Sequence, residues 1–65
     1  MNIQLNGETR DVSAVTLDAL LIETGFEDAV VATAVNGAFV PAPSRAAQSL
    51  KDGDSIEVLA PMQGG

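Results

Sequence analysis

The first residues alternate polar and apolar, with Ile3 and Leu5 on one face, as is typical of a half-buried strand. An Asn-Gly pair at 6–7 follows and favours the tight turn of a β-hairpin. A strict two-residue turn would set Glu8 opposite Leu5 and Arg10 opposite Ile3, which places charges on the core side. We therefore expect a longer loop or a bulge here, and the pattern leaves the register open.

A helix is predicted next, because Leu17, Leu20 and Leu21 follow helical spacing. Thr16 precedes them and can cap the free amides of the first turn. Gly25 is expected to end the helix, since the residue after a helix often needs a positive φ. These signals predict about two and a half turns with the three leucines facing the core.

Residues 30–35 are an apolar, largely β-branched run that ends at a second Asn-Gly pair, and residues 38–40 can pair back before Pro41. We expect a second hairpin whose first strand lies inside the sheet. Periodicity does not decide which alternating set meets the helix, Val31, Thr33 and Val35 or Val30, Ala32 and Ala34.

The remaining pattern predicts a loop over residues 41–49 with one helical turn from Ser44 onward, a turn at 52–54 and a last strand over 55–60. Ile56 and Val58 share one face of that strand. The element order is hairpin, helix, hairpin, strand. It predicts an α+β domain in which one main helix packs across one face of a small mixed sheet of four to five strands.

Composition excludes several classes of chemistry. The chain has 65 residues, enough for one domain, and contains neither cysteine nor histidine. Thiolate and imidazole metal sites, a Cys or His nucleophile and disulfides are therefore excluded. No apolar run approaches the roughly 20 residues that cross a bilayer, so we expect a cytoplasmic protein without membrane association.

Nine acidic residues against three basic ones give a net charge of −6, which disfavours binding to nucleic acid and favours basic protein surfaces. Asp52 and Asp54 flank a glycine, but the other ligands of a calcium loop are missing, so we expect a plain turn and no metal. Glu23, Glu27 and Asp28 are expected to be solvated charges rather than catalytic carboxylates.

The element order and four segments resemble the sulfur carrier proteins of bacterial thiamine biosynthesis, which have a ubiquitin-like β-grasp fold and end in Gly-Gly. The matching segments are IQLNG at 3–7, VNGAFVP at 35–41, DGD at 52–54 and PMQGG at 61–65. The resemblance implies a β-grasp domain over 1–60, with its first and last strands parallel and adjacent at the centre of the sheet. It also implies a flexible tail over 61–65.

The resemblance places the reacting group at the carboxylate of Gly65. It implies that a separate E1-like activating enzyme holds Mg-ATP and adenylates Gly65. A sulfur donor such as a cysteine desulfurase then supplies the sulfur of a C-terminal thiocarboxylate, which thiazole synthase accepts. The chain would thus be a co-substrate without a stably bound cofactor, monomeric on its own, and not an enzyme.

The expected partner-binding residues of the tail are Pro61, Met62, Gln63 and Gly64. Glycine at the last two positions fits a narrow channel because it lacks a Cβ, and Pro61 limits pairing to the sheet. Phe39 is a possible partner-binding residue, and a place in the core is the equal alternative.

Three other functions fit the same pattern. The small subunit of molybdopterin synthase shares the fold and activation chemistry, although that family is longer and more aromatic before its tail. A ubiquitin-like protein modifier would instead form isopeptides on other proteins. An interaction domain with an inert tail would function without Gly65.

Overall fold

The structure is a computed structural model and describes residues 1–60. One α-helix, one 3₁₀ helix and five strands follow one another along this part of the chain. In chain order they are β1 (Asn2–Leu5), β2 (Glu8–Asp11), α1 (Leu17–Glu23), β3 (Ala32–Val35), β4 (Ala38–Val40), η1 (Ala42–Ala47) and β5 (Ser55–Leu59). The predicted order of hairpin, helix, hairpin and strand is confirmed.

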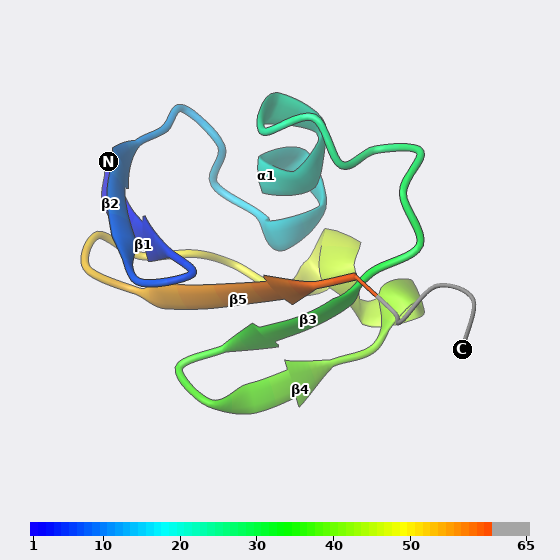
Figure 1. Cartoon of the computed structure of the whole chain (residues 1–65). Helices are drawn as coiled ribbons and strands as arrows, with labels where there is room; N and C mark the ends of the chain where they lie inside the picture. Colours follow the sequence, from blue (N-terminus) through cyan, green and yellow to red (C-terminus); the bar gives the residue numbers. More distant parts are fainter. Residues whose placement is uncertain (61–65) are drawn as a thin grey trace.

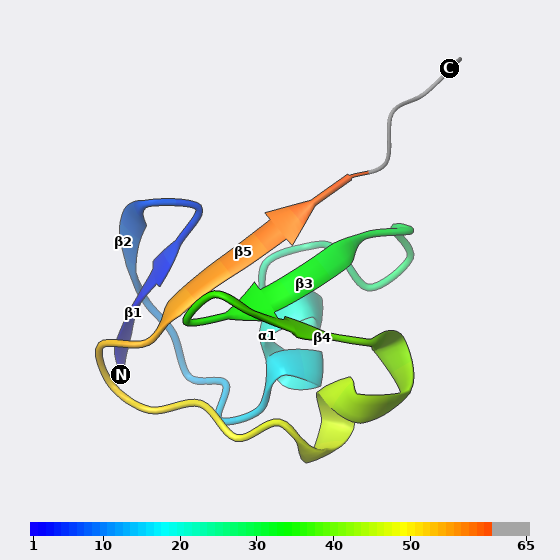
Figure 2. The same ribbon diagram turned by 90° about the horizontal axis from the view of Figure 1, so that it is seen from below.

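The five strands form one mixed sheet in the order β2-β1-β5-β3-β4. The last strand, β5, lies at its centre, parallel to β1 and antiparallel to β3. Helix α1 covers one face of the sheet, and the opposite face carries no helix (Figures 1 and 2). The implied parallel pairing of the first and last strands at the centre is therefore confirmed.

A single hydrophobic core fills the space between α1 and the sheet. Ile3, Leu17, Leu20 and Ile56 are fully buried at its centre. Burying an aliphatic side chain of this size contributes roughly 1.5–3 kcal/mol to the free energy of unfolding. Neither phenylalanine is fully buried, so the core is aliphatic. The other buried apolar residues are Leu5, Val12, Ala14, Leu21, Val35, Val40, Leu50 and Val58.

The ends of α1 are set by the residues expected from the sequence. The Thr16 hydroxyl accepts a hydrogen bond from the Ala19 amide at 3.3 Å, which satisfies one of the free amides of the first turn. Gly25 has a φ of +91°, a value that glycine adopts without steric cost, and it follows the helix end closely. The predicted cap and helix stop are both confirmed.

The expected bulge in the first hairpin is wrong. Leu5 pairs with Glu8 and Ile3 with Arg10, so Asn6-Gly7 forms the strict two-residue turn. The charges are tolerated because β2 is an edge strand whose four residues are all exposed. Glu8 and Arg10 also form an ion pair at 3.4 Å along this edge, so neither charge enters the core.

The second hairpin forms as predicted, but its first strand is shorter than the apolar run. β3 begins at Ala32, which pairs with Leu59 at the end of β5, and Val30 is 81% exposed. Because β5 ends at Leu59, it offers no strand residue that could pair with the residues before Ala32. Apolar character alone therefore does not extend β3. Thr33 and Val35 are buried, which settles the face that the periodicity left open.

The two Asn-Gly turns do more than reverse the chain, because both asparagine side chains bind β5. The Asn6 amide donates to the Val58 carbonyl at 3.1 Å and accepts from the Val58 amide at 2.9 Å. On the other side, Asn36 accepts from the Ser55 amide at 3.0 Å. Both asparagines have positive φ values, 52° and 50°. They therefore combine the turn geometry with side-chain bonds that hold β5 on both flanks.

The 41–49 segment contains the short 3₁₀ helix η1, which begins earlier than the helical turn expected from the sequence. Arg45 on η1 donates to the Thr33 hydroxyl at 3.0 Å and to the Val31 carbonyl at 2.6 Å. Thr33 itself donates to the Val40 carbonyl at 2.8 Å. This network satisfies Thr33, which is only 1% exposed, and ties η1 to β3.

The carboxylates of the 52–54 turn bind protein groups, as expected of a plain turn. Asp52 accepts from the Asn2 amide at 2.7 Å. Asp54 accepts from the Asn36 side chain at 3.0 Å and from the Lys51 amide at 2.8 Å. These two hydrogen bonds, chiefly the one from Asn36, hold the pKa of Asp54 below its ordinary value.

We predict that Asn6→Gly lowers the free energy of unfolding by about 1–3 kcal/mol. The variant loses the two side-chain hydrogen bonds to Val58, while glycine keeps the positive φ of the turn. Asn6→Asp keeps an acceptor for the Val58 amide and should lose less. Urea unfolding measures both variants. An Asn6→Gly variant as stable as the parent chain would show that the side-chain bonds to Val58 contribute nothing.

We also predict a pH-dependent effect of Asp54→Asn. Because the folded pKa is lowered, the ionised carboxylate stabilises the fold above its unfolded pKa of about 3.9, and this contribution is lost as pH falls through the folded value. The variant should therefore be less stable than the parent at pH 7, with a gap that closes in the acid range. Thermal unfolding from pH 7 to pH 3 measures this gap, and a gap independent of pH contradicts the assignment.

Candidate functional site

The sequence places the candidate site at the tail, and the fold determines where that tail leaves the domain. β5 lies between β1 and β3, so the chain leaves the sheet from its centre after Leu59 (Figure 2). A central strand is held by two neighbours, which gives the exit point a fixed position. The predicted site residues Pro61, Met62, Gln63, Gly64 and Gly65 lie outside the described residues.

The face of the sheet opposite α1 carries an apolar area beside this exit. Ala34 is paired with Phe39 on β4 and with Glu57 on β5, while Ala32 is paired with Leu59. Directly paired residues share a face, so all five lie on the open side. We call these residues the open-face patch: Ala32, Ala34, Phe39, Glu57 and Leu59.

Phe39 is 69% exposed, so the alternative that placed it in the core is wrong. With Leu59, which is 59% exposed, it borders a shallow hollow of about 100 Å³ on the open face. The two side chains lie on either side of β3, and exposed apolar patches of this kind mark contact surfaces. The role of Phe39 in partner binding stays a prediction, but its position suits that role.

The rest of the open face is polar. Gln4 on β1 pairs with Ser55 on β5, and Thr9 on β2 pairs with Gln4. All three residues are exposed, with no large apolar side chain among them. The apolar part of this face is therefore confined to β3, β4 and the end of β5, where the chain leaves the sheet.

Sequence reasoning did not single out Glu57 or Leu59. The sequence does contain a signal for Leu59. Ile56 and Val58 face the core, so residues 55, 57 and 59 face outward, where polar side chains are the norm. Leu59 breaks this alternation. The pairing of Glu57 with Ala34, and through it the proximity to Phe39, depends on the strand order and could not be obtained from periodicity.

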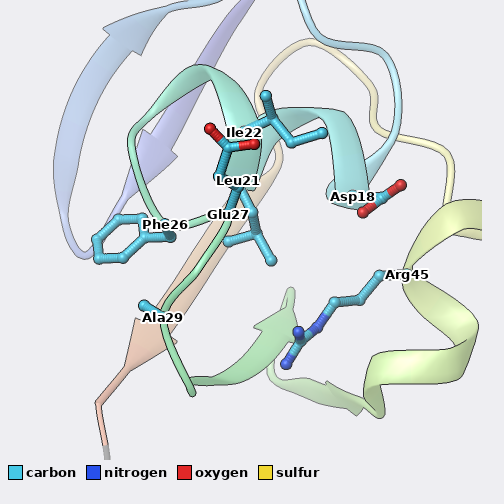
Figure 3. Close-up of a pocket in the computed structure, with 7 residues that line it drawn as sticks. All are labelled: Asp18, Leu21, Ile22, Phe26, Glu27, Ala29 and Arg45. Atoms are coloured by element: carbon cyan, nitrogen blue, oxygen red, sulfur yellow. The ribbon is translucent and has the colours of Figure 1, made fainter.

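A second hollow of about 230 Å³ lies on the helix side, between α1, the following loop and η1 (Figure 3). Leu21 and Phe26 form its apolar wall. Asp18, Glu27 and Arg45 also line it, and the Arg45 guanidinium is already bound to Val31 and Thr33. Carboxylates and a guanidinium in one small hollow favour neither an anion nor a cation, so this hollow defines no ligand.

Within residues 1–60, no group of three or more carboxylate side chains lies close enough together to hold a metal ion. The same residues include no helix long and apolar enough to cross a membrane. The described part of the chain thus offers a surface beside the tail exit as its candidate site.

The fold defines the class first: this is a ubiquitin-like β-grasp protein. The crystal structure of the thiamine biosynthesis protein ThiS from Geobacter metallireducens matches with a TM-score of 0.85 and 30% identity over 100% of both chains. An NMR solution structure of a thiamine biosynthesis protein from the same organism matches with a TM-score of 0.80 and 29% identity, over 100% of this chain and 88% of that one.

Sequence comparisons then define the family. The ThiS family model matches residues 3–65, and the chain belongs to the ThiS family. It is 44% identical over 66 residues to the sulfur carrier protein ThiS of Thermus thermophilus, covering 97% of this chain and 98% of that protein. The predicted membership of the thiamine-biosynthesis sulfur carriers is confirmed.

A second relative is much longer than this chain. The chain is 41% identical over 66 residues to a thiazole synthase of Paramagnetospirillum magneticum, covering 100% of this chain and 20% of that protein. The chain therefore spans one fifth of the length of this relative. A segment similar to this chain is thus part of a protein named for thiazole synthesis.

Proposed function

We propose that this chain is a sulfur carrier for thiamine biosynthesis that works through the carboxylate of Gly65. The observation that carries the proposal is the ThiS family match over residues 3–65, which includes the Gly-Gly pair. The central position of β5 supports it, because the strand that leads to the tail is held by neighbours on both sides. The chain then acts as a co-substrate of other enzymes rather than as an enzyme.

The first step is adenylation of the tail by a separate activating enzyme. A terminal carboxylate is ionised at neutral pH, with a reference pKa of about 3.3–3.7, so its oxygen can attack the α-phosphorus of ATP. The bond from that phosphorus to pyrophosphate breaks and an acyl adenylate forms at Gly65. The activating enzyme supplies the Mg-ATP, as the resemblance to the family implies.

The second step exchanges oxygen for sulfur. A sulfur donor, such as a cysteine desulfurase, delivers persulfide sulfur whose outer atom attacks the acyl carbon and displaces AMP, which leaves an acyl disulfide between the tail and the donor. A second thiol then attacks the donor-side sulfur, forms a disulfide with the donor and releases the tail as a thiocarboxylate. Thiazole synthase is the proposed acceptor of that sulfur. The similarity to a segment of a thiazole synthase supports this partner, because the two activities would then have been joined in one chain.

The open-face patch is the proposed docking surface for these partners. A five-residue tail buries little surface by itself, so recognition needs contacts with the folded domain. Phe39 and Leu59 are exposed and apolar, and Leu59 is the last residue of β5, so covering them would contribute binding energy. We propose that the activating enzyme and thiazole synthase use this face in turn, on a monomeric carrier.

The experiment that tests this function is intact mass spectrometry after incubation with ATP, the activating enzyme of the same organism and a sulfur source. We predict a species in which one oxygen of the chain is replaced by sulfur. Fragmentation should place the sulfur at Gly65, because the terminal carboxylate is the group that is adenylated.

A chain lacking Gly65 is the matched control and should remain unmodified while folding normally, since residues 1–60 form the core. An unmodified parent chain under conditions in which the enzyme is active would contradict the sulfur-carrier function. Branched peptides ending in the Gly-Gly pair on other proteins would instead indicate a protein modifier.

A further inference from the structure

Glu57 is the single charged residue in the open-face patch. The neighbouring β5 residues Ile56 and Val58 are buried, so Glu57 points to the opposite side. It pairs with Ala34, which in turn pairs with Phe39, and it lines the hollow of about 100 Å³. Its carboxylate therefore lines the same hollow as the two exposed apolar side chains Phe39 and Leu59.

Within residues 1–60, Glu57 has no ion-pair partner. The described ion pairs join Glu8 to Arg10 and the terminal ammonium to Asp11. Arg45 donates to Thr33 and Val31 through η1, on the helix side of the sheet. In this part of the chain, Glu57 also accepts no hydrogen bond from a side chain, so its carboxylate faces water.

A protein that fills this hollow and covers Phe39 and Leu59 also meets Glu57, because all three residues line it. Removing a carboxylate from water is costly unless a cation with hydrogen-bond donors replaces the water. An apolar surface that fits Phe39 and Leu59 but leaves Glu57 unpaired would therefore bind poorly. A partner that covers the patch therefore binds best when it brings a positive charge to the Glu57 side of the apolar contact.

We infer that the activating enzyme docks on the open-face patch with an arginine or lysine side chain placed against Glu57. This inference rests on the proposed function. An adenylating enzyme binds the negative phosphates of ATP, so its surface around the tail channel is expected to be positive. The net charge of −6 on this chain complements such a surface, and the planar guanidinium of arginine fits a carboxylate with two hydrogen bonds.

The test measures the KM for the carrier in ATP–pyrophosphate exchange, with the activating enzyme of the same organism. Glu57→Gln removes the charge and should raise the KM about three- to tenfold with little change in kcat, because a binding contact is lost rather than a reacting group. Glu57→Lys should raise it more than tenfold, since two cations then face each other. Phe39→Ala should raise it as well, because the patch is covered on docking.

Glu27→Lys is the matched control: it makes the same change of charge at an exposed residue of the loop after α1, on the helix side. We expect its KM to stay within about twofold of the parent value. The excess effect of Glu57→Lys should persist at high salt, since a buried pair is screened less than surface charges. Circular dichroism confirms that each variant is folded.

Two outcomes separate this inference from the function on which it rests. A parent chain that supports no exchange overturns the sulfur-carrier function and the inference together. If the parent chain is adenylated but Glu57→Lys and Glu27→Lys have equal KM values, only the inference is overturned. Any change in KM would then come from the net charge of the chain and not from a contact at Glu57.

Discussion

The fold depends on how the last strand is held at the centre of the sheet. β5 is inserted between β1 and β3, elements separated from it by much of the chain, and the backbone ladders are supplemented by two asparagine side chains. Asn6 bonds both backbone groups of Val58, and Asn36 bonds the start of the strand at Ser55. The strand that leads toward Gly65 is therefore held on both sides up to Val58 on the β1 side and Leu59 on the β3 side.

The two faces of the sheet have different environments. One face packs against α1 and contains the aliphatic core, in which Ile56 and Val58 take part. The other face of the same strand carries Glu57 and Leu59, which line one hollow with Phe39. No helix covers this face of the sheet (Figure 2). Because side chains alternate along a strand, substitutions on the open face can alter partner binding without disturbing the core. This separation supports the proposal that the open face binds partners.

Much of the fold was predictable from local patterns, and the failures have physical reasons. Thr16 and Gly25 marked the helix ends because capping depends on neighbouring residues in the chain. The first hairpin was mispredicted because β2 is an edge strand, a fact that only the strand order reveals. The same limit hid the position of Glu57 against Ala34 and the bonds from both asparagines to β5. The tail residues were identified from the resemblance to the family, since a pair of glycines has no periodic signal.

The most direct test of the carrier function follows the sulfur itself. The chain is loaded with a heavy sulfur isotope at Gly65, freed from the sulfur source and incubated with thiazole synthase and the other thiazole precursors. The proposed function predicts that the isotope appears in the thiazole product while the chain returns to its carboxylate form. Unlabelled thiazole together with a chain that keeps its labelled sulfur would contradict it.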